Sequence, residues 1–444
     1  MKRAWILVTA ALLAVALYPP ASAHASWKPA KSLDNIKTPE LTWEKPEAMR
    51  RELPNGMIVY LLENHRLPLV NVQARVRTGS LYEPENEAGV AQTVGIMLRR
   101  GGTDQLSPDE VDEKFDFMAA DVSTDISPDA GLATLNVPTD NFEDALALYA
   151  QLLMHPGFDE EQLEVARNQV KEGIRRQNDN PVQIAIREYW KLLYGPDHPA
   201  ARTPTFETVD ALNRQELVDF HAKYYHPNNV MLAVAGDFDP DTIDDQIMAA
   251  FAGWTKEEVS FPEIPEVSAP DEASVHYAVK DVPQSTILVG HLGTTLKNPD
   301  HTAIDIMNSI LGGSGFSSRI VETIRNDRGL AYFAGSFYQM GTTMPGAFIG
   351  VSLTQADSTT VALQLLLDEI EKIRQKEVDE KELETARNME LNSEVFQYDN
   401  TAEVANRTMW LEYYGLPKDF LEKNLEAVKS IDRERVLEVA KEYP

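Results

Sequence analysis

One short stretch of the chain holds a cation and a phenol, two side-chain types that could serve catalysis. In IRNDRGLAY, Arg325 and Tyr332 lie seven residues apart. A fixed cation and a phenol donor aimed at a carbonyl oxygen would stabilise negative charge that develops in a transition state. The residues alone favour a simpler interpretation, in which Arg325 is a solvated residue at a helix end and Tyr332 is a strand residue facing the core. Arg328 is a weaker alternative for the cation.

The sequence offers few other groups for catalysis. It has no cysteine, which excludes disulfides, a thiol nucleophile and a lipid-modified cysteine anchor. Its nine histidines include no pair at positions i and i+4, the spacing with which one helix face binds zinc. His221 and His226 are five residues apart, and His226 precedes a proline in a turn. We therefore predict that the histidines of this chain form no zinc site.

The net charge of the chain disfavours some classes of binding partner. The chain has 444 residues and a formal net charge of −29. Phosphate binding needs a basic face, so this charge disfavours nucleic acid and anionic membrane surfaces as partners. Solubility through self-repulsion is the simplest interpretation, and a basic partner or substrate is the alternative.

Residues 1–25 have the features of a signal peptide. Lys2 and Arg3 precede an apolar run over residues 4–17, and the small-residue motif AHA ends at Ala25. The run is too short for a comfortable membrane span, and an uncleaved anchor is the alternative. We expect export to a bacterial periplasm, with no membrane span after cleavage and an irregular arm over residues 26–47.

The chain repeats itself at a nearly constant offset of about half its length. DEEQLEVARNQ, which begins at residue 159, recurs as DEKELETARNM at residue 379, and VDALNRQELVDFHAKYY at residue 209 recurs as VKSIDRERVLEVAKEYP at residue 428. These matches indicate two homologous domains in tandem, a duplication of one fold. We place the domains at 48–250 and 275–444, joined by a linker rich in Pro and Glu at 251–274.

Strand and helix patterns are interleaved irregularly in each half. GMIVYLLEN and VNVQARVRTGS alternate as strands do, whereas residues 160–176 and 358–376 have the pattern of amphipathic helices. This predicts an α+β fold, in which each half is an α/β sandwich with a mixed or antiparallel sheet covered by helices. The first half continues after residue 225 into the strand NVMLAVAGDF, but the second half stops at Pro444. Either the second half lacks its last strand or the sequence is truncated.

Three segments of the chain together resemble the M16 family of pitrilysin-type, inverted-zincin peptidases in its bacterial short-chain form. They cover residues 51–80, 224–238 and, most specifically, 298–338, NPDHTAIDIMNSILGGSGFSSRIVETIRNDRGLAYFAGSFY. The resemblance extends roughly from Pro46 to Pro444 and implies that the same domain fold occurs twice.

Active members of that family carry His-x-x-Glu-His on the helix that follows GVA, where two His bind zinc and the Glu serves as general base. In this chain the three positions fall on Gln92, Gly95 and Ile96, which can neither bind a metal nor move a proton. The family's further metal-binding Glu falls on Ala166, with Glu172 as a poorer candidate. Hydrolysis by this chain alone is therefore not expected.

The same resemblance gives Arg325 and Tyr332 a role, because active members use an Arg and a Tyr at this spacing to contact substrate and stabilise the oxyanion. It implies a non-catalytic, substrate-clamping subunit of a two-chain peptidase. The partner brings His-x-x-Glu-His and the zinc, and peptides or unfolded polypeptides are the substrate. The alternatives are a zinc-free peptide-binding or chaperone-like homodimer, a scaffold subunit, and an autonomous peptidase with an unrecognised metal site.

Two further segments lead to expectations about local structure. LGGSGFSSR lacks the ending of a phosphate-binding loop, so Gly312, Gly313 and Gly315 are expected to form a tight turn between helices. ADVSTDISPDAGLATLNV aligns with the strand that pairs with substrate in active members. Ser123 to Asp125 replace the usual residues there, so we expect the strand to remain and its role in pairing to be in doubt.

Overall fold

The computed structural model describes residues 46–269, 272–393, 396, 398 and 400–443. These residues belong to one compact unit. The expected signal peptide and all but the last two residues of the expected arm lie outside the described residues. No helix in the described part of the chain is both long and apolar enough to cross a membrane.

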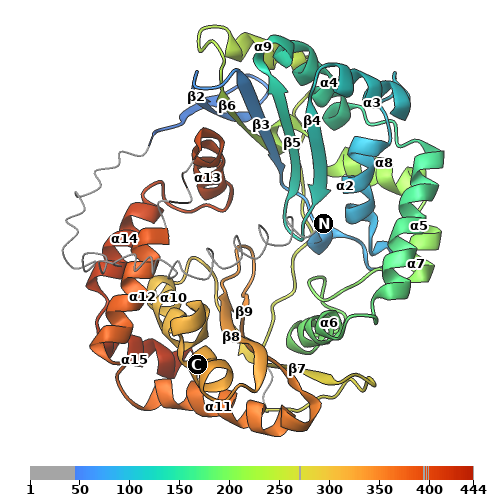
Figure 1. The fold of residues 1–444 in the computed structure, drawn as a ribbon. Coiled ribbons are helices and arrows are strands. Elements are labelled where there is room, and N and C mark those ends of the chain that lie inside the picture. Colours follow the sequence, from blue (N-terminus) through green and yellow to red (C-terminus); the bar gives the residue numbers. More distant parts are fainter. Residues whose placement is uncertain (1–45, 270–271, 394–395, 397, 399, 444) are drawn as a thin grey trace, which may run out of the picture. The chain divides into compact units, whose positions relative to one another are not determined.

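A six-stranded mixed sheet is the framework of the first half (Figure 1). Its strand order is β1-β2-β6-β3-β5-β4; β2 and β6 run parallel and the other neighbours run antiparallel. β3 alternates between buried and half-exposed residues, because one face packs against helices, whereas β6 is buried on both faces. The strands are β1 Met49–Glu52, β2 Ile58–Glu63, β3 Leu69–Val76, β4 Asp121–Ile126, β5 Gly131–Pro138 and β6 Val230–Gly236.

Helices cover one face of this sheet and share a hydrophobic core with it. Apolar side chains from α2, α3, α4, α5, α8 and α9 all join that core. Several helices begin at a capping residue: the Ser107 side chain accepts a hydrogen bond from the Glu110 amide, and Glu110 reaches back to the Ser107 amide. The helices are α2 Val90–Arg100, α3 Pro108–Phe117, α4 Phe142–Met154, α5 Glu160–Arg176, α6 Pro181–Tyr194, α7 Phe206–Ala211, α8 Arg214–Tyr224 and α9 Ile243–Ala250.

The second half has a smaller antiparallel sheet with its own core. Its order, β7-β9-β8, repeats the order β3-β5-β4 of the first sheet. The strands are β7 Gln284–Leu292, β8 Ala331–Gln339 and β9 Ala347–Gln355. The α-helices are α10 His301–Asn308, α11 Thr359–Gln375, α12 Glu380–Ser393, α13 Thr401–Tyr413, α14 Phe420–Ser430 and α15 Arg433–Glu442. Two π-helical segments, η6 Ser309–Gly313 and η8 Val321–Asp327, follow α10.

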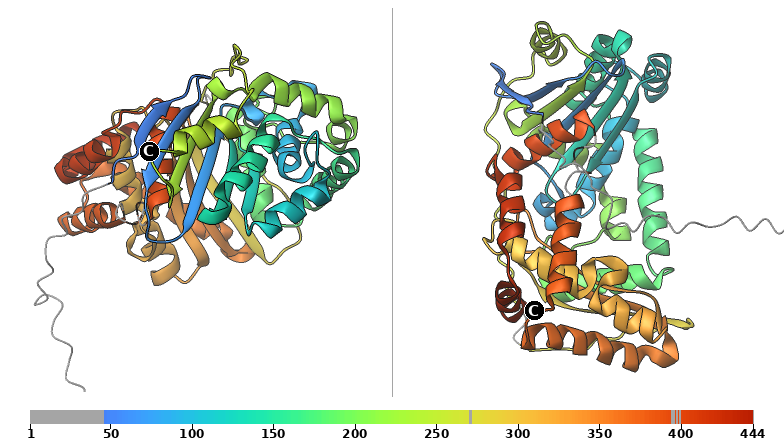
Figure 2. Two further views of the ribbon diagram at one scale, coloured as in Figure 1. Left: turned by 90° about the horizontal axis from the view of Figure 1, so that it is seen from above. Right: turned by 60° about the vertical axis from the view of Figure 1, so that its left-hand side comes forward.

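The two halves exchange one helix each. α13, from the second half, packs on β2 and β6 of the first sheet and completes a third apolar cluster there (Figures 1 and 2). α6, from the first half, packs on β7 of the second sheet, where the Tyr189 hydroxyl donates to the Phe348 carbonyl at 2.7 Å. The two helices begin at Pro181 and Thr401, a separation that equals the offset of the sequence repeat. The prediction of an α+β fold with two related halves is confirmed, but neither exchanged helix was predicted.

The segment between the halves has neither helix nor strand over residues 255–269 and 272–282. It is anchored on the first half by Phe261, whose ring centre lies 5.0 Å from that of Tyr82. Further on, Val275, Tyr277 and Val279 are 72–98% exposed. No counterpart of β6 lies beside β7 among the described residues. The predicted domain boundaries and the absence of a last strand from the second half stay predictions.

Candidate substrate-contact site

Helix α2 carries the three positions that align with a zinc motif. Gln92 is exposed, Gly95 is buried and Ile96 is half-buried against the first core. Gly95 lies against β4, and a Cβ atom there would be 2.7 Å from the Ile126 amide nitrogen. The Thr124 hydroxyl also donates to the Gly95 carbonyl at 2.6 Å. This close approach leaves no room for a side chain at Gly95 unless β4 moves.

The start of α2 is held by a buried carboxylate. Glu83 accepts hydrogen bonds from the amides of Gly89 at 3.1 Å and Ala91 at 2.7 Å. These amides are two of the unpaired donors at a helix N-terminus. Burial raises the pKa of Glu83 to about 7, although its amide partners act in the opposite direction. Helix α2 is therefore a well-anchored structural element even though it carries no metal ligand.

The expected fourth position offers no metal ligand either. Ala166 is buried in the first core on α5, a helix that packs against α2. Glu172 lies further along α5 and hydrogen-bonds to Arg176 at 2.6 Å and Arg175 at 3.3 Å, which lowers its pKa. Its carboxylate is thus occupied on the helix surface.

The histidines singled out from the sequence have structural contacts. His221 is buried, its Nε2 donates to the Leu153 carbonyl at 2.8 Å, and burial lowers its pKa to about 4. The imidazole of His226 contacts the Ala222 carbonyl at 2.7 Å. Among the described residues, no group of three or more His, Asp or Glu could hold a metal ion.

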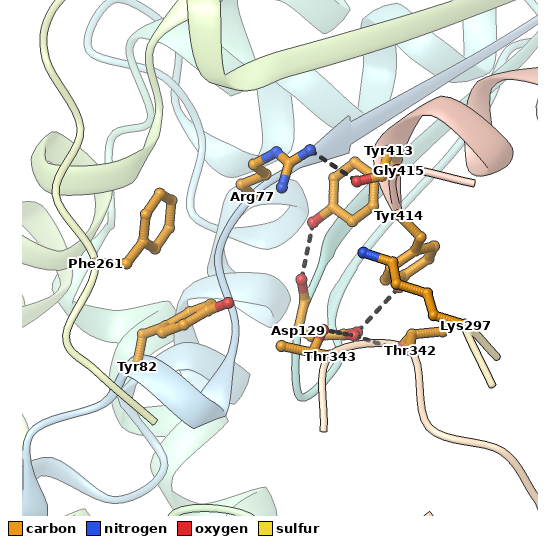
Figure 3. Close-up of a pocket in the computed structure, with 10 residues that line it drawn as sticks. All are labelled: Arg77, Tyr82, Asp129, Phe261, Lys297, Thr342, Thr343, Tyr413, Tyr414 and Gly415. Carbon is orange, nitrogen blue, oxygen red and sulfur yellow. Dashed lines mark hydrogen bonds between the residues drawn. The ribbon is translucent and has the colours of Figure 1, made fainter. Parts of the chain in front are cut away.

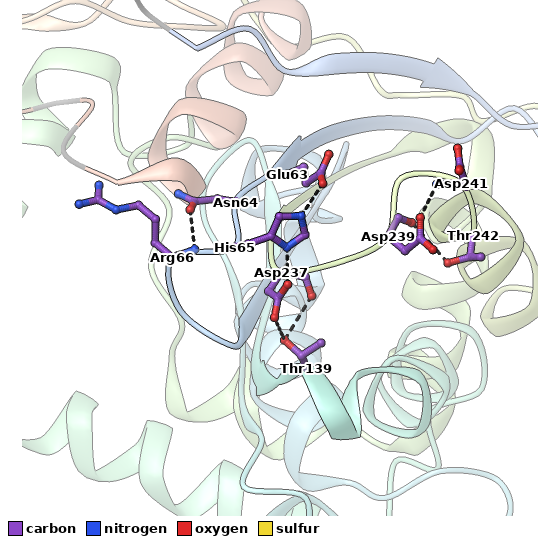
Figure 4. A network of polar contacts seen from close by, with 9 residues as sticks. All are labelled: Glu63, Asn64, His65, Arg66, Thr139, Asp237, Asp239, Asp241 and Thr242. Carbon is purple, nitrogen blue, oxygen red and sulfur yellow. Dashed lines mark hydrogen bonds and ion pairs between the residues drawn. The ribbon is translucent and has the colours of Figure 1, made fainter.

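Another histidine lies between two carboxylates at one end of the first sheet (Figure 4). Nε2 of His65 is 2.5 Å from Glu63 and Nδ1 is 2.5 Å from Asp237. These hydrogen bonds, with that to Asp237 the stronger influence, raise the pKa of His65. Since both ring nitrogens are occupied as donors, this cluster serves as an exposed ion-pair network.

The structure brings Arg325 and Tyr332 together. The guanidinium carbon of Arg325 is 5.7 Å from the ring centre of Tyr332 and 4.5 Å from that of Phe316. Contacts of this kind between a guanidinium and two rings hold the cation in place. Tyr332 is 81% exposed, so the interpretation of a core-facing tyrosine is wrong. Arg328 is exposed at the residue after η8.

Arg325 and Tyr332 both belong to segments with irregular backbone geometry. Arg325 belongs to the π-helical segment η8. Tyr332 is the extra residue of a β-bulge, because Ala331 pairs with Thr354 while Phe333 pairs with the neighbouring Leu353. Bulges and π-helical turns redirect side chains and are common beside functional sites. Sequence reasoning missed Phe316, although a phenylalanine in the polar run GGSGFSS was a signal that could have identified it.

The glycine-rich segment before this site packs against β8. A Cβ on Gly312 would lie 2.3 Å from the Ser336 amide nitrogen, so only glycine fits there. Gly315 has φ +66, which favours glycine, and leads into a short 3-10 turn. The predicted tight turn is present at Gly315, but Gly312 and Gly313 belong to the π-helical segment η6. The turn sets the place of Phe316 beside Arg325.

Comparisons with known proteins agree with this fold. A model described as "Insulinase (Peptidase family M16)" matches residues 58–194, and "Peptidase M16 inactive domain" matches residues 211–390. This chain belongs to the M16 peptidase family.

Relatives of this M16 chain carry contrasting names. An "Uncharacterized zinc protease" of Rickettsia bellii is 24% identical over 84% of this chain and 90% of its own length. A "Non-peptidase homolog YmxG" of Helicobacter pylori is 23% identical over 86% of this chain and 88% of its own length. A solved "peptidase M16 inactive domain" from Pseudomonas fluorescens is 25% identical, covers 89% of this chain and 95% of its own, and superposes with a TM-score of 0.81.

The donor set of this M16 chain does not fit the zinc of the family motif. Zinc in such sites is held by imidazole nitrogens and carboxylate oxygens. The aligned side chains are an amide at Gln92, a hydrogen at Gly95, a hydrocarbon at Ile96 and a methyl at Ala166. No step of a zinc reaction can be derived from these residues.

The strand expected to pair with substrate is present in the M16 fold as β4. It forms the last strand of the first sheet and pairs only with β5 among the described residues. Ser123 contacts Thr134 at 2.7 Å, and Thr124 is tied to helix α2. β4 thus keeps one open edge, while two of its side chains are engaged within the chain.

A junction between the halves of this M16 chain was not predicted from the sequence (Figure 3). Asp129, in the β4–β5 turn, accepts hydrogen bonds from Thr342 and Thr343 at 2.7 Å and from Tyr414 at 3.1 Å. These groups line a cavity of about 330 Å³ with Arg77. No sequence signal pointed to Asp129, because its three partners all lie in the other half of the chain.

Proposed function

We propose that the chain is the non-catalytic, substrate-clamping subunit of a zinc-dependent M16-type peptidase. Its partner is an M16 chain that carries His-x-x-Glu-His and the zinc. This chain supplies Arg325 and Tyr332 to the shared active site, where the substrate is a peptide or an unfolded polypeptide segment.

The observation that carries the proposal is the contrast between two places in one chain. At Gly95 the helix packs so closely on β4 that a glutamate would require β4 to move. At Arg325 and Tyr332, a cation and a phenol lie together on irregular backbone with the phenol exposed. Because the phenol is exposed, this pair is accessible to a substrate from solvent.

The chemistry of the pair suits an accessory role. A guanidinium is a permanent cation, and a phenol donates one hydrogen bond, so both can stabilise a developing oxyanion. In the free chain, water screens the pair because Tyr332 is exposed and Arg325 is only half-buried. Docking of a partner that excludes water would strengthen both interactions.

The names of two relatives support a divided family. One is named a zinc protease and another a non-peptidase homolog, and this chain matches both at similar identity. We therefore place this chain in the second group and place the zinc chemistry on another chain.

Co-purification tests the pairing. The tagged, mature protein is purified from its native periplasm and the bound proteins are identified by mass spectrometry. We expect a stoichiometric M16 chain of similar size with His-x-x-Glu-His, and hydrolysis by the purified pair but by neither chain alone. Self-association without such a chain would contradict the pairing and favour a zinc-free peptide-binding homodimer.

We also propose that the protein is periplasmic. The support is the charged start, apolar run and AHA motif of residues 1–25. N-terminal sequencing of the protein from a periplasmic fraction should begin at Ser26. A full-length N-terminus in the membrane fraction would contradict this.

A further inference from the structure

Corresponding faces of the two sheets differ in chemistry. In each sheet, one face packs on its own helices and the opposite face, here called the open face, carries the helix exchanged from the other half. On the first sheet, the open face beyond α13 is polar, with Asn71 opposite Asn136 and Gln73 opposite Thr134. On the second sheet, the paired positions beyond α6 are apolar, with Phe333 opposite Leu353 and Phe337 opposite Ile349.

These four residues, Phe333, Phe337, Ile349 and Leu353, form a surface that we call the apolar shelf. Phe333 is 40% exposed and Phe337 is 49% exposed, and their rings are nearly parallel with centres 6.3 Å apart. Ile349 and Leu353 are half-buried. Contiguous exposed apolar surface is unfavourable in water and marks a contact site. The polar residues of the first sheet show that this fold does not require apolar residues on the open face.

The apolar shelf adjoins the Arg325–Tyr332 pair. Phe333 follows Tyr332 directly, and the bulge at Tyr332 places both side chains in solvent. β8 pairs only with β9 among the described residues, so one backbone edge beside the apolar shelf is open. At its other side, Leu353 also lines a cavity of about 440 Å³ between the start of α6 and β7. An extended peptide could thus contact the backbone edge, the pair and the shelf together.

Charge favours a peptide over a second copy of the chain. The chain carries a net charge of −29, so another copy or an acidic peptide is repelled. A neutral or basic peptide is not repelled in this way. Arg325 offers such a peptide a cation for a carbonyl or carboxylate oxygen beside the shelf.

We infer that the apolar shelf selects peptides with a bulky apolar side chain next to the segment held at Arg325 and Tyr332. Phe333 and Phe337 are thus specificity-determining residues. This inference rests on the proposed function and names the substrate class of the same site. Burial of a leucine or phenylalanine side chain on the shelf is expected to favour such peptides about tenfold or more over a polar analogue.

The experiment uses the reconstituted pair and two neutral peptides that differ only in one residue, leucine or serine. The ratio of their kcat/KM values measures selection. We expect Phe333→Ser together with Phe337→Ser to reduce a preference of about tenfold or more for the leucine peptide to near unity. Phe337→Leu should retain most of the preference. Phe117→Ser, which alters a phenylalanine that is 91% exposed on the first half, is the matched control.

A preference unchanged in the double variant, with folding verified by circular dichroism, would overturn the inference. The proposed function fails separately, if the wild-type pair hydrolyses neither peptide. In that event, fluorescence titration of this chain with both peptides still tests the shelf, and equal affinities would overturn it. If sedimentation instead shows a wild-type homodimer that the double variant abolishes, the shelf is a self-association surface and the inference is wrong.

Discussion

Gly95 lies so close to Ile126 that a Cβ atom on the glycine would be 2.7 Å from the Ile126 amide nitrogen. The position aligned with the general base of active M16 peptidases is thus a point of very close packing between helix α2 and strand β4. The loss of the base is coupled to the packing of the fold, so reversion at this position also has a structural cost.

Replacement of Gly95 by alanine should destabilise the protein. Alanine normally favours a helix over glycine by about 1 kcal/mol, but overpacking against the β4 backbone costs about 1–3 kcal/mol. We expect a net loss on urea unfolding. Gly173→Ala is the matched control, because Gly173 lies on helix α5 with no heavy atom within 4 Å of a built Cβ, and this change should stabilise by about 0.5–1 kcal/mol. Stabilisation by both changes would contradict the close approach.

Restoring the motif should not create a working zinc site. The triple variant Gln92→His, Gly95→Glu and Ile96→His still has alanine at position 166, and its new glutamate meets the β4 backbone. Elemental analysis and a peptide-hydrolysis assay on the isolated chain should show neither stoichiometric zinc nor robust activity. Robust hydrolysis would mean that the fourth ligand has been assigned to the wrong residue.

Arg325→Ala or Tyr332→Phe should slow the reconstituted pair without dissociating it. Loss of one oxyanion donor lowers kcat by about 10²–10³-fold. The measurement is the turnover of each variant with the catalytic partner, together with the stoichiometry of the complex. Arg328→Ala removes an exposed cation three residues away and serves as control. Turnover equal to wild type for both substitutions would return these residues to a purely structural role.

The buried carboxyl of Glu83 should make stability depend on pH. Burial raises its folded-state pKa to about 7, above the ordinary value of 4.5, so the folded chain binds this proton more tightly than the unfolded chain. Its contribution to stability is complete below about pH 4.5 and is lost as the pH rises through 7, a change on the order of 3 kcal/mol.

Urea unfolding at pH 5 and pH 8 measures this effect. Glu83→Gln cannot ionise, so wild type should lose more stability than the variant between these two pH values. Asp305, whose pKa burial also raises to about 7, acts in the same direction in both proteins and cancels in the comparison. Equal losses in both proteins would show that Glu83 titrates normally.

Much of the fold could be predicted from the sequence. The period-2 pattern of β3 and the helical pattern of α5 are local properties, and they were predicted with bounds close to those observed. The internal repeat indicated two related halves, and both halves contain the same strand order in part. The exchange of α6 and α13 could not be predicted, because it depends on which distant sheet each helix covers.

For the candidate site, the sequence by itself determined which side chains are available: the positions aligned with the zinc motif hold no metal ligand, and Arg325 and Tyr332 occur seven residues apart. Only the tertiary structure decided where these groups lie. Tyr332 is exposed because of a bulge in the pairing of β8 with β9. Gly95 has no room for a side chain because the backbone of β4 packs directly against it. The type of each side chain is fixed by the sequence at its own position. Its exposure and its packing distances depend on contacts between segments that are far apart in the chain.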